Sequence, residues 1–250
     1  MKIDRLNAME QYVIKKETVS IDELCRVFDV SKNTIRRDLN ELKTRGRIAK
    51  VYGGVTAVNQ SSAAPILAQA ALNQDSKEKI GRMAAEFVED GDTIFVDSGS
   101  TAVWVLPYLS DRRGVTVITH SLPAMAEAAK YDNLELLALG GIYNCDTSSF
   151  LGISSLENIA TVTIHKAFMA ATGVSIRGGV TNITYMESEV KKSVVSHTDK
   201  IILMADSTKV GKEAFASFCR LSDIYAFVTD RPLPEEYNQF LQKNDIIIKL

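Results

Sequence analysis

The chain has 250 residues, enough for one large domain or two unequal ones. With 46% hydrophobic and 24% charged residues it is neither disordered nor fibrous, and no apolar run approaches the about 18 residues of a membrane span. The amino terminus lacks the apolar block of a secretory signal, so we expect a cytoplasmic protein without a membrane partner. The three cysteines and three histidines have irregular spacings, which predict no disulfide framework and no metal site, and we expect no cofactor.

Charge is distributed unevenly along the chain. Residues 1–57 carry a net charge of +4 and the remainder carries −6. A basic head on an acidic body indicates that the head meets a polyanion, although random scatter of charge remains the alternative.

Two amphipathic helices are predicted at the start of the head. Residues 2–16 have apolar side chains at helical spacing, at Ile3, Leu6, Met9 and Val13. A capping box of Ser20 and Glu23 opens the second helix, whose apolar stripe is Ile21, Leu24, Cys25 and Phe28. Both helices therefore bury one face.

A third helix is predicted after Ser31, with an inner stripe of Ile35, Leu39 and Leu42. Its outer face is polar and basic, with Thr34 near its start and Lys32, Asn33, Arg36, Arg37 and Asn40 pointing outward. Arg and Asn are the side chains that make bidentate contacts with guanine and adenine, so this is the pattern of a recognition helix in a helix-turn-helix. The alternative is a solvated charged face on a three-helix bundle.

A wing is predicted after the third helix. Residues 47–51 and 55–57 have strand character, and Gly53 and Gly54 supply the hairpin turn. Phosphate contacts are expected from the wing, at Arg47, Lys50 and Tyr52. The capping, the spacing and the wing together favour a DNA-binding domain over the plain bundle.

A polar, nearly uncharged segment with Pro65 follows the wing at residues 58–75, and we place the linker there. The predicted domains are thus a winged helix-turn-helix at residues 1–57 and a body at residues 76–250. A capping pattern at residues 75–78 opens the first helix of the body, with apolar positions at Ile80, Met83, Ala84 and Phe87.

Seven short apolar runs alternate with helical patterns in the body. The runs span residues 93–96, 115–118, 134–139, 167–171, 201–205, 224–228 and 246–248. Helices are expected at residues 102–109, 122–131, 187–197 and 234–243. This alternation predicts an α/β body with a largely parallel sheet covered on both faces, because parallel strands need crossover helices.

Polar or small residues follow five of these runs, and the carboxyl ends of parallel strands share one edge of a sheet, where ligands bind. The loop at residues 98–101 has the glycine, the hydroxyls and the following helix amino terminus that a bound phosphate needs. Lys209 could neutralise that anion, while Asp97 and Asp206 could accept hydrogen bonds from sugar hydroxyls. Each piece alone is also explained by a helix cap, a surface lysine or a core histidine, and Glu189 and Lys191 fit a helix surface better than a site.

The chain resembles the DeoR family of bacterial sugar-catabolism regulators in three stretches of the head. These are residues 19–24 (VSIDEL), 30–39 (VSKNTIRRDL) and 51–55 (VYGGV). The resemblance implies a winged helix-turn-helix that binds double-stranded operator DNA and works as a homodimer or homotetramer. The predicted DNA-binding residues are Ser31, Lys32, Asn33, Thr34, Arg36, Arg37, Arg47, Lys50 and Tyr52.

The body also resembles that family's effector domain, in motifs that include residues 97–101, 119–122, 150–152, 189–191 and 206–211. The resemblance implies a fold related to ribose-5-phosphate isomerase and a phosphorylated sugar as ligand. His120 stands where that family usually has Asn, and Gln69 lies near the place of a frequent Arg. The predicted effector-binding residues are Asp97, Ser98, Gly99, Ser100, Thr101, Thr119, His120, Ser121, Gly140, Gly141, Lys166, Thr172, Gly173, Asp206 and Lys209.

Residues 32–34, 50–56 and 166–173 look most like the subgroup that represses myo-inositol catabolism, which implies a phosphorylated keto-deoxy-gluconate as effector. We therefore expect a repressor and no catalytic residues. One alternative is a sugar-phosphate isomerase with an appended head, although the paired acidic motif and glycine-rich lysine loop associated with that enzyme are absent. The other is a structural DNA-binding protein with an inert oligomerisation domain.

Overall fold

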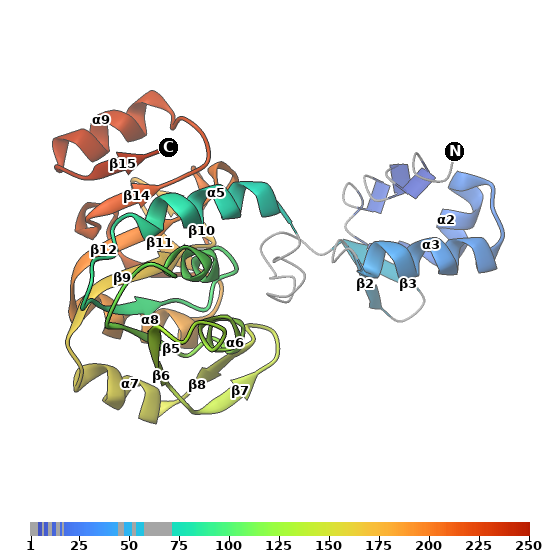
Figure 1. The fold of residues 1–250 in the computed structure, drawn as a ribbon. Coiled ribbons are helices and arrows are strands. Elements are labelled where there is room, and N and C mark those ends of the chain that lie inside the picture. The colour runs from blue at the N-terminus through green and yellow to red at the C-terminus, as the bar shows by residue number, and fades with distance from the viewer. Residues whose placement is uncertain are drawn as a thin grey trace. The chain divides into compact units, whose positions relative to one another are not determined.

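The computed structural model describes residues 5–6, 8–9, 12–13, 16, 18–44, 48–51, 54–57 and 72–250 (Figure 1). The chain divides into two compact units, Met1–Ala71 and Leu72–Leu250. They are called here the head and the body. Among the described residues, no helix is long and apolar enough to cross a membrane.

The head contains the predicted helices and hairpin. The described residues within 5–16 have helical backbone and precede β1 (Thr18–Ser20), α2 (Ile21–Phe28) and α3 (Lys32–Thr44). The hairpin pairs β2 (Ile48–Val51) with β3 (Gly54–Ala57), and β1 adds a third strand that sequence reasoning missed. A Cβ at Gly54 would lie 2.3 Å from the Val19 carbonyl oxygen, so β3 can approach β1 only because residue 54 is glycine.

The apolar stripes of the head form one core, as the helical spacing predicted. Its fully buried residues are Leu6, Met9, Val13, Val19, Leu24, Ile35, Leu39, Leu42, Ile48 and Val55. Two polar ties hold the first helix to this core: Arg5 Nε donates to the buried Asp38 at 2.8 Å, and the Tyr12 hydroxyl donates to Glu23 at 2.9 Å. Ser20 caps α2 by accepting from the Glu23 N–H at 3.1 Å.

Within residues 72–250, which are described without a gap, seven strands form one parallel sheet in the order β15-β14-β12-β9-β4-β5-β6. Each strand overlaps one of the seven predicted apolar runs, so the predicted fold class is confirmed. In chain order the strands are β4 (Thr93–Val96), β5 (Val115–Thr119), β6 (Leu134–Ala138), β9 (Ile164–Ala170), β12 (Thr198–Met204), β14 (Ala226–Val228) and β15 (Ile247–Lys249).

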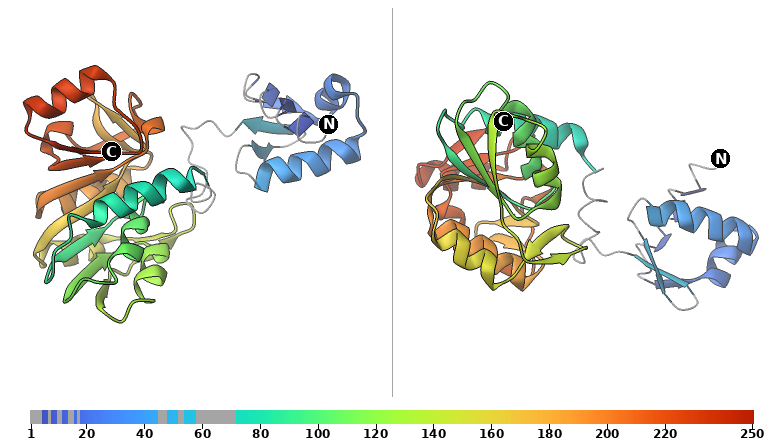
Figure 2. Two further views of the ribbon diagram at one scale, coloured as in Figure 1. Left: turned by 45° about the horizontal axis from the view of Figure 1, so that its top comes forward. Right: turned by 60° about the horizontal axis from the view of Figure 1, so that its bottom comes forward.

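Helices cover both faces of the sheet (Figure 2). One apolar core joins the sheet to α5 (Gln74–Ala85), η1 (Ala102–Tyr108) and α6 (Leu122–Ala128). The other joins it to α7 (Ile153–Ala160), α8 (Tyr185–Ser196) and α9 (Glu235–Lys243). From β4 the chain adds β5 and β6 on one side, and then adds β9, β12, β14 and β15 on the other side. The boundary between β4 and β9 is therefore the topological switch point, where ligands of such sheets bind.

Several local expectations were wrong. The helix predicted at residues 102–109 is a 3-10 helix that contains Pro107. Helix α5 begins at Gln74 after a left-handed Asn73, so Asp75 lies in its first turn instead of capping it. Sequence reasoning also missed α7 and two small sheets, which consist of β7 (Ile142–Asn144) with β8 (Ser149–Leu151), and of β10 (Gly173–Ser175), β11 (Gly179–Asn182) and β13 (Ala216–Cys219).

Candidate DNA-binding and effector sites

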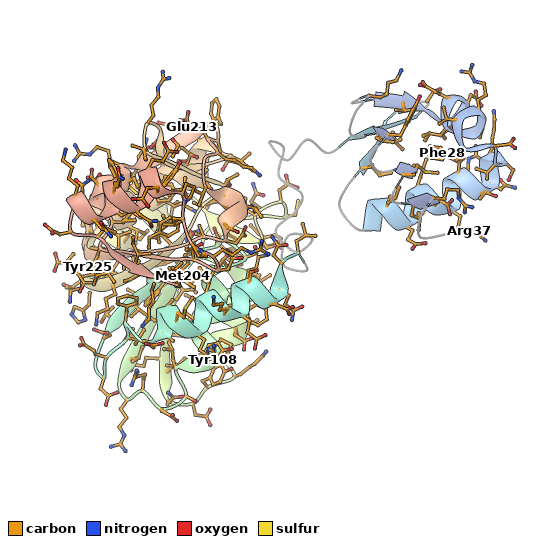
Figure 3. All side chains as sticks on the ribbon, turned by 90° about the horizontal axis from the view of Figure 1, so that it is seen from above. Phe28, Arg37, Tyr108, Met204, Glu213 and Tyr225 are labelled. Atoms are coloured by element: carbon orange, nitrogen blue, oxygen red, sulfur yellow. The ribbon has the colours of Figure 1, made fainter. Side chains whose placement is uncertain are left out.

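Helix α3 presents the predicted polar face to solvent. Lys32, Asn33, Arg36, Arg37 and Asn40 are exposed, while the opposite stripe lies in the core of the head. Figure 3 shows Arg37 projecting outward from α3. The structure thus gathers the base-reading candidates on one accessible surface.

Two contacts organise the start of α3. The Ser31 hydroxyl caps the helix by accepting from the Thr34 N–H at 3.3 Å, and it lies 3.1 Å from the Thr34 hydroxyl. The Lys32 ammonium lies 2.6 Å from Asp22 of α2, and this pairing raises the pKa of Lys32 and lowers that of Asp22. The charge of Lys32 is thus paired with α2.

The predicted phosphate contacts of the wing stay a prediction. Arg47 and Tyr52 lie outside the described residues, and for Lys50 only the backbone is described, where it pairs with Val55 in the hairpin.

In the body, Asp97 follows β4 at the switch point and is completely buried. Its Oδ2 accepts from the Lys191 ammonium at 2.7 Å and from the Ala170 N–H at 3.0 Å. Lys191 also donates to the Ala170 carbonyl at 2.8 Å and lies 5.0 Å from the centre of the Phe218 ring. The expectation that Lys191 belongs to a helix surface was therefore wrong: only 2% of it is exposed, because α8 carries it into the edge of the sheet.

A buried carboxyl accompanies this ion pair on α8. Glu187 accepts from the Thr184 hydroxyl at 2.8 Å, and burial raises its pKa against the opposing effect of Lys191. Sequence reasoning missed Glu187 because its position in the helix has no pattern that separates it from the exposed Glu residues.

The loop that follows Asp97 lies tightly against the end of β9. A Cβ at Gly99 would come within 2.2 Å of the Ala170 Cβ, so only glycine fits there. Ser98 and Thr101 are buried, and Gly99 and Ser100 are half-buried. The predicted phosphate loop is thus fixed beside the switch point.

At the end of β5, Thr119 and Ser121 hold the local structure, whereas the ring nitrogens of His120 have no hydrogen-bond partner among the described residues. The Thr119 hydroxyl donates to the Val96 carbonyl at 2.7 Å, and the Ser121 hydroxyl caps α6 by accepting from the Ala124 N–H at 3.3 Å. His120 is fully buried, with its ring centre 5.7 Å from that of Phe95, and burial lowers its pKa to about 4. The imidazole is therefore neutral at pH 7.

Buried side-chain atoms without a hydrogen-bond partner gather at the carboxyl ends of β4 and β5. Within the described protein, eight buried side-chain N and O atoms have no hydrogen-bond partner, and five of them belong to Asp97, Ser98, His120 and Ser148. Ser148 comes from the turn between β7 and β8, whose backbone folds back so that its carbonyl accepts from the Leu122 N–H at 2.9 Å. Buried polar atoms are normally satisfied, so such a cluster marks a candidate binding site. No sequence signal pointed to Ser148.

Asp206 and Lys209 follow β12, and Lys77 of α5 is close enough for both charges to affect its pKa. Asp206 caps the short helix η2 (Ser207–Lys209) by accepting from the Thr208 N–H at 3.0 Å. Burial lowers the pKa of Lys77, on α5, to about 8, with Asp206 opposing the shift and the charge of Lys209 adding to it. The structure adds Lys77 to the predicted pair of Asp206 and Lys209.

The remaining predicted effector residues have different positions. Gly140 and Gly141 follow β6, the outermost strand on that side, whereas Thr172 and Gly173 follow β9 beside the switch point. Lys166 was misplaced: it lies near the start of β9, opposite Ile94, with its ammonium 2.6 Å from Asp92 and 2.8 Å from Glu89. Because Lys166 lies at the amino ends of the strands and the effector site lies at their carboxyl ends, we remove Lys166 from the effector site.

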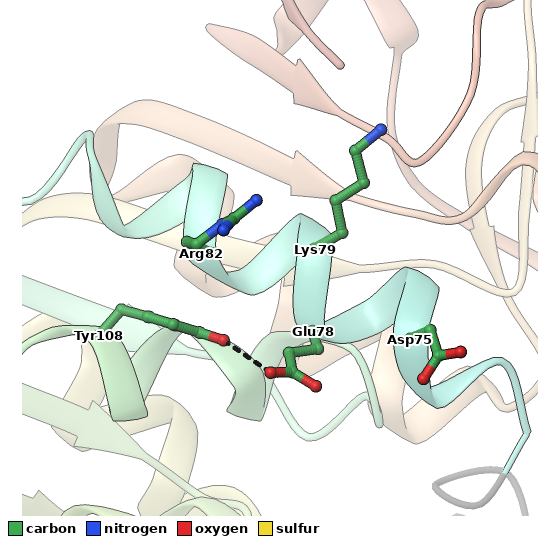
Figure 4. A pocket seen from close by; sticks show the side chains of 5 residues that line it. All are labelled: Asp75, Glu78, Lys79, Arg82 and Tyr108. Atoms are coloured by element: carbon green, nitrogen blue, oxygen red, sulfur yellow. Dashed lines mark hydrogen bonds between the residues drawn. The ribbon is translucent and has the colours of Figure 1, made fainter.

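A shallow groove on the surface of α5 and η1 is lined by charged side chains and a tyrosine (Figure 4). The Tyr108 hydroxyl donates to Glu78 at 3.2 Å across it. None of the predicted effector residues lines this groove, whose residues are Asp75, Glu78, Lys79, Arg82 and Tyr108.

Comparison with known proteins agrees with this two-part organisation. A model of the DeoR-like helix-turn-helix domain matches residues 5–61, and a model of the DeoR C terminal sensor domain matches residues 72–231. The chain is also similar to ribose 5-phosphate isomerase A from Methanocaldococcus jannaschii, with 22% identity, a TM-score of 0.40 and 55% of each chain covered. For a D-ribose-5-phosphate isomerase in complex with phospho-erythronic acid the identity is 16%, the TM-score is 0.42, and 55% of this chain and 54% of that chain are covered.

Relatives match along nearly the whole chain. The HTH-type transcriptional regulator IolR of Bacillus subtilis is 39% identical over 250 residues, with both chains fully covered. The lactose phosphotransferase system repressor of Staphylococcus epidermidis is 31% identical, with 92% of each chain covered. The glycerol-3-phosphate regulon repressor of Escherichia coli is 27% identical, with 98% of each covered. The chain therefore belongs to the DeoR family of helix-turn-helix transcriptional regulators, as its motifs predicted.

Proposed function

We propose that the chain represses a sugar or inositol catabolic operon and that a phosphorylated sugar releases it from operator DNA. The observation that carries the proposal is the joining of a DeoR-like head to a sensor body whose switch point holds a cluster of unpartnered buried polar atoms. In this proposal residues 1–57 bind DNA, residues 58–75 are the linker, and residues 76–250 sense the effector and form a homodimer or homotetramer.

DNA recognition is assigned to the exposed face of α3. Asn33, Arg36 and Arg37 would read base edges in the major groove, because their planar side chains match the hydrogen-bonding patterns of adenine and guanine. Arg47, Lys50 and Tyr52 of the wing would contact phosphates and fix the register. In this proposal the Lys32 ammonium would pair with a DNA phosphate in place of Asp22.

The effector is assigned to the edge of the sheet at the switch point. Neutral His120 can both donate and accept a hydrogen bond, and the free Oδ1 of Asp97 can accept one, so hydroxyl and keto groups suit these atoms. The phosphate would lie against the loop at residues 98–101, with Lys77 and Lys209 supplying positive charge. The inositol-subgroup motifs favour a phosphorylated keto-deoxy-gluconate, and the 39% identity to IolR supports the assignment to that subgroup.

We further propose that the body does not catalyse isomerisation. A proton transfer needs a carboxylate poised over the substrate carbon, but Asp206 caps η2 and Oδ2 of Asp97 is bound to Lys191 and to the backbone. The remaining oxygen of Asp97, Oδ1, is assigned here to a hydroxyl group of the effector, so neither carboxylate is left as a base. Turnover of ribose 5-phosphate should be nil, and measurable turnover would revive the enzyme alternative.

Regulation requires only modest coupling between the two sites. About 1–3 kcal/mol changes DNA affinity by roughly 5- to 150-fold, and DNA must weaken effector binding by the same factor. The deciding experiment is fluorescence anisotropy of labelled upstream DNA at fixed salt, titrated with a panel of phosphorylated sugars that includes inositol-pathway intermediates. Release by one phosphosugar supports the proposal, whereas tight DNA binding without any release contradicts the sensor assignment.

Fluorescence of Trp104, the single tryptophan, provides a DNA-free readout of the same binding step. Trp104 lies on η1, directly after the loop at residues 98–101, and packs against Gly81 of α5. A phosphosugar that releases DNA should also change this fluorescence with the same concentration dependence, after allowance for linkage.

A further inference from the structure

The two outer edges of the parallel sheet differ in how they are protected. At one edge, β15 has three residues and includes Lys249, which pairs with Glu86 and lies 5.1 Å from the centre of the Phe87 ring. At the other edge, β6 has five residues, with the sequence Leu-Glu-Leu-Leu-Ala and no lysine or proline. Short strands, lysine and proline are the usual devices that stop an edge from pairing, so only β6 is left open.

Apolar side chains surround the open edge. Leu136 and Leu137 lie on opposite faces of β6 and are 37% and 40% exposed. The adjacent hairpin adds Ile142, which is 80% exposed, and Tyr143, which is 45% exposed. We call these four residues the β6 patch. Within the described residues no strand pairs with the outer side of β6.

We propose that the β6 patch binds the same patch of a second copy of this chain, with the two β6 strands paired antiparallel about a two-fold axis. The reason for choosing a second copy is that the seven-stranded parallel sheet, which is described without a gap, has a single open edge. Two open edges would let copies add without limit, whereas one open edge pairs with its equivalent and closes at two copies. The blocked edge at β15 prevents further strand addition.

Charge and length select the register of this pairing. Centring on Leu136 pairs all five residues of each strand, with Leu134 of one copy opposite Ala138 of the other and Glu135 opposite Leu137. Centring on Glu135 would pair three residues and place two like charges directly opposite each other, which is destabilising. Glu135 already accepts a hydrogen bond from the Thr116 hydroxyl of β5 at 3.3 Å, which draws its charge away from the open edge.

This interface deepens the proposed function and rests on it in one respect: two joined bodies carry two heads, and helix-turn-helix dimers read two half-sites. The pairing of the bodies is measured without DNA, so failure of the interface and failure of DNA binding can be told apart.

The experiment is sedimentation velocity of the full chain and four lysine variants. Leu137→Lys and Ile142→Lys alter the β6 patch. Their matched controls are Ile247→Lys on β15, where Ile247 is also 40% exposed, and Phe215→Lys, where Phe215 is 81% exposed. Both patch variants should sediment with half the mass of the wild type at a concentration where the controls keep full mass. Circular dichroism verifies that each variant is folded.

Hydrogen exchange keeps the test valid if a variant is unstable. In the wild type, the outward amides of β6 should be protected at high protein concentration and lose protection on dilution. A monomeric wild type, full mass in both patch variants, or β6 amides that exchange equally at all concentrations would overturn the interface. Operator binding is measured in parallel: its absence in the wild type contradicts the proposed function and leaves the mass result standing.

Discussion

The head and the body place their functional groups in opposite environments. In the head, the side chains proposed to read DNA project from one exposed face of α3, and among the residues described there the core behind them is apolar except for Asp38. In the body, the polar groups at the switch point are themselves buried, and Asp97 and Lys191 form an ion pair within the core. Changes at the head site should therefore affect binding alone, whereas changes at the body site should also affect folding.

The largest expected effect comes from the buried ion pair. Lys191→Met leaves the Asp97 carboxylate buried without its partner, so the free energy of unfolding of the body should fall by about 3–5 kcal/mol. Urea denaturation followed by Trp104 fluorescence measures this. Lys192→Met is the control, because Lys192 pairs with Glu189 on the surface and should change stability by less than about 1 kcal/mol. Equal losses in the two variants would refute the structural role of Lys191.

The burial of His120 should make the free energy of unfolding depend on pH. Its pKa is about 4 in the folded chain and about 6.5 when unfolded, so between these values the unfolded state binds more protons. Stability should fall by about 3 kcal/mol as the pH drops from 6.5 to 4, because protonation favours the unfolded chain. His120→Asn should remove that part of the dependence, and the control His197→Asn, at an exposed position, should keep it. An unchanged pH profile in His120→Asn would show that the imidazole is solvated.

A smaller effect is expected at the recognition helix. Arg37→Ala should weaken operator binding by about 1–3 kcal/mol, roughly 5- to 150-fold, and reduce discrimination between sequences, since a base contact is lost. Stability should change by less than about 0.5 kcal/mol because the side chain is exposed. Arg220→Ala, which removes an exposed arginine from the body, should leave operator affinity unchanged. Anisotropy that shows full discrimination in Arg37→Ala would exclude that residue from base reading.

The smallest of these effects concerns Lys209. Lys209→Ala should raise the phosphosugar concentration for half-release of DNA by about tenfold, or about 1.4 kcal/mol, and leave DNA affinity without effector unchanged. Lys243→Ala, on the exposed side of α9, is the charge-matched control. If both variants respond to the effector like the wild type, Lys209 does not contact the phosphate.

Much of the fold could be predicted because the relevant signals are local. Ser20 and Ser31 cap helices where the sequence places them, and the apolar runs at residues 93–96 and 115–118 become β4 and β5. The strands β10 and β11 form a local hairpin of three and four residues, too short to show a period of their own, and β13 was missed because its partner β11 is distant in the sequence. The 3-10 helix η1 is a different case, because its signal was local: Pro107 has no N–H to donate and disfavours a continuous α-helix in a sequence that otherwise reads as α-helical.

The sequence by itself determined the exposed face of α3, the order of the seven parallel strands along the chain, and the polar residues that follow them, because these depend on spacing and on chain neighbours. Tertiary structure alone decided which side chains meet. It joined Asp97 to Lys191, 94 residues away, and it paired Lys166 with Asp92 and Glu89. Such pairings depend on crossover connections and on packing across the sheet, and the identities of nearby residues do not encode them.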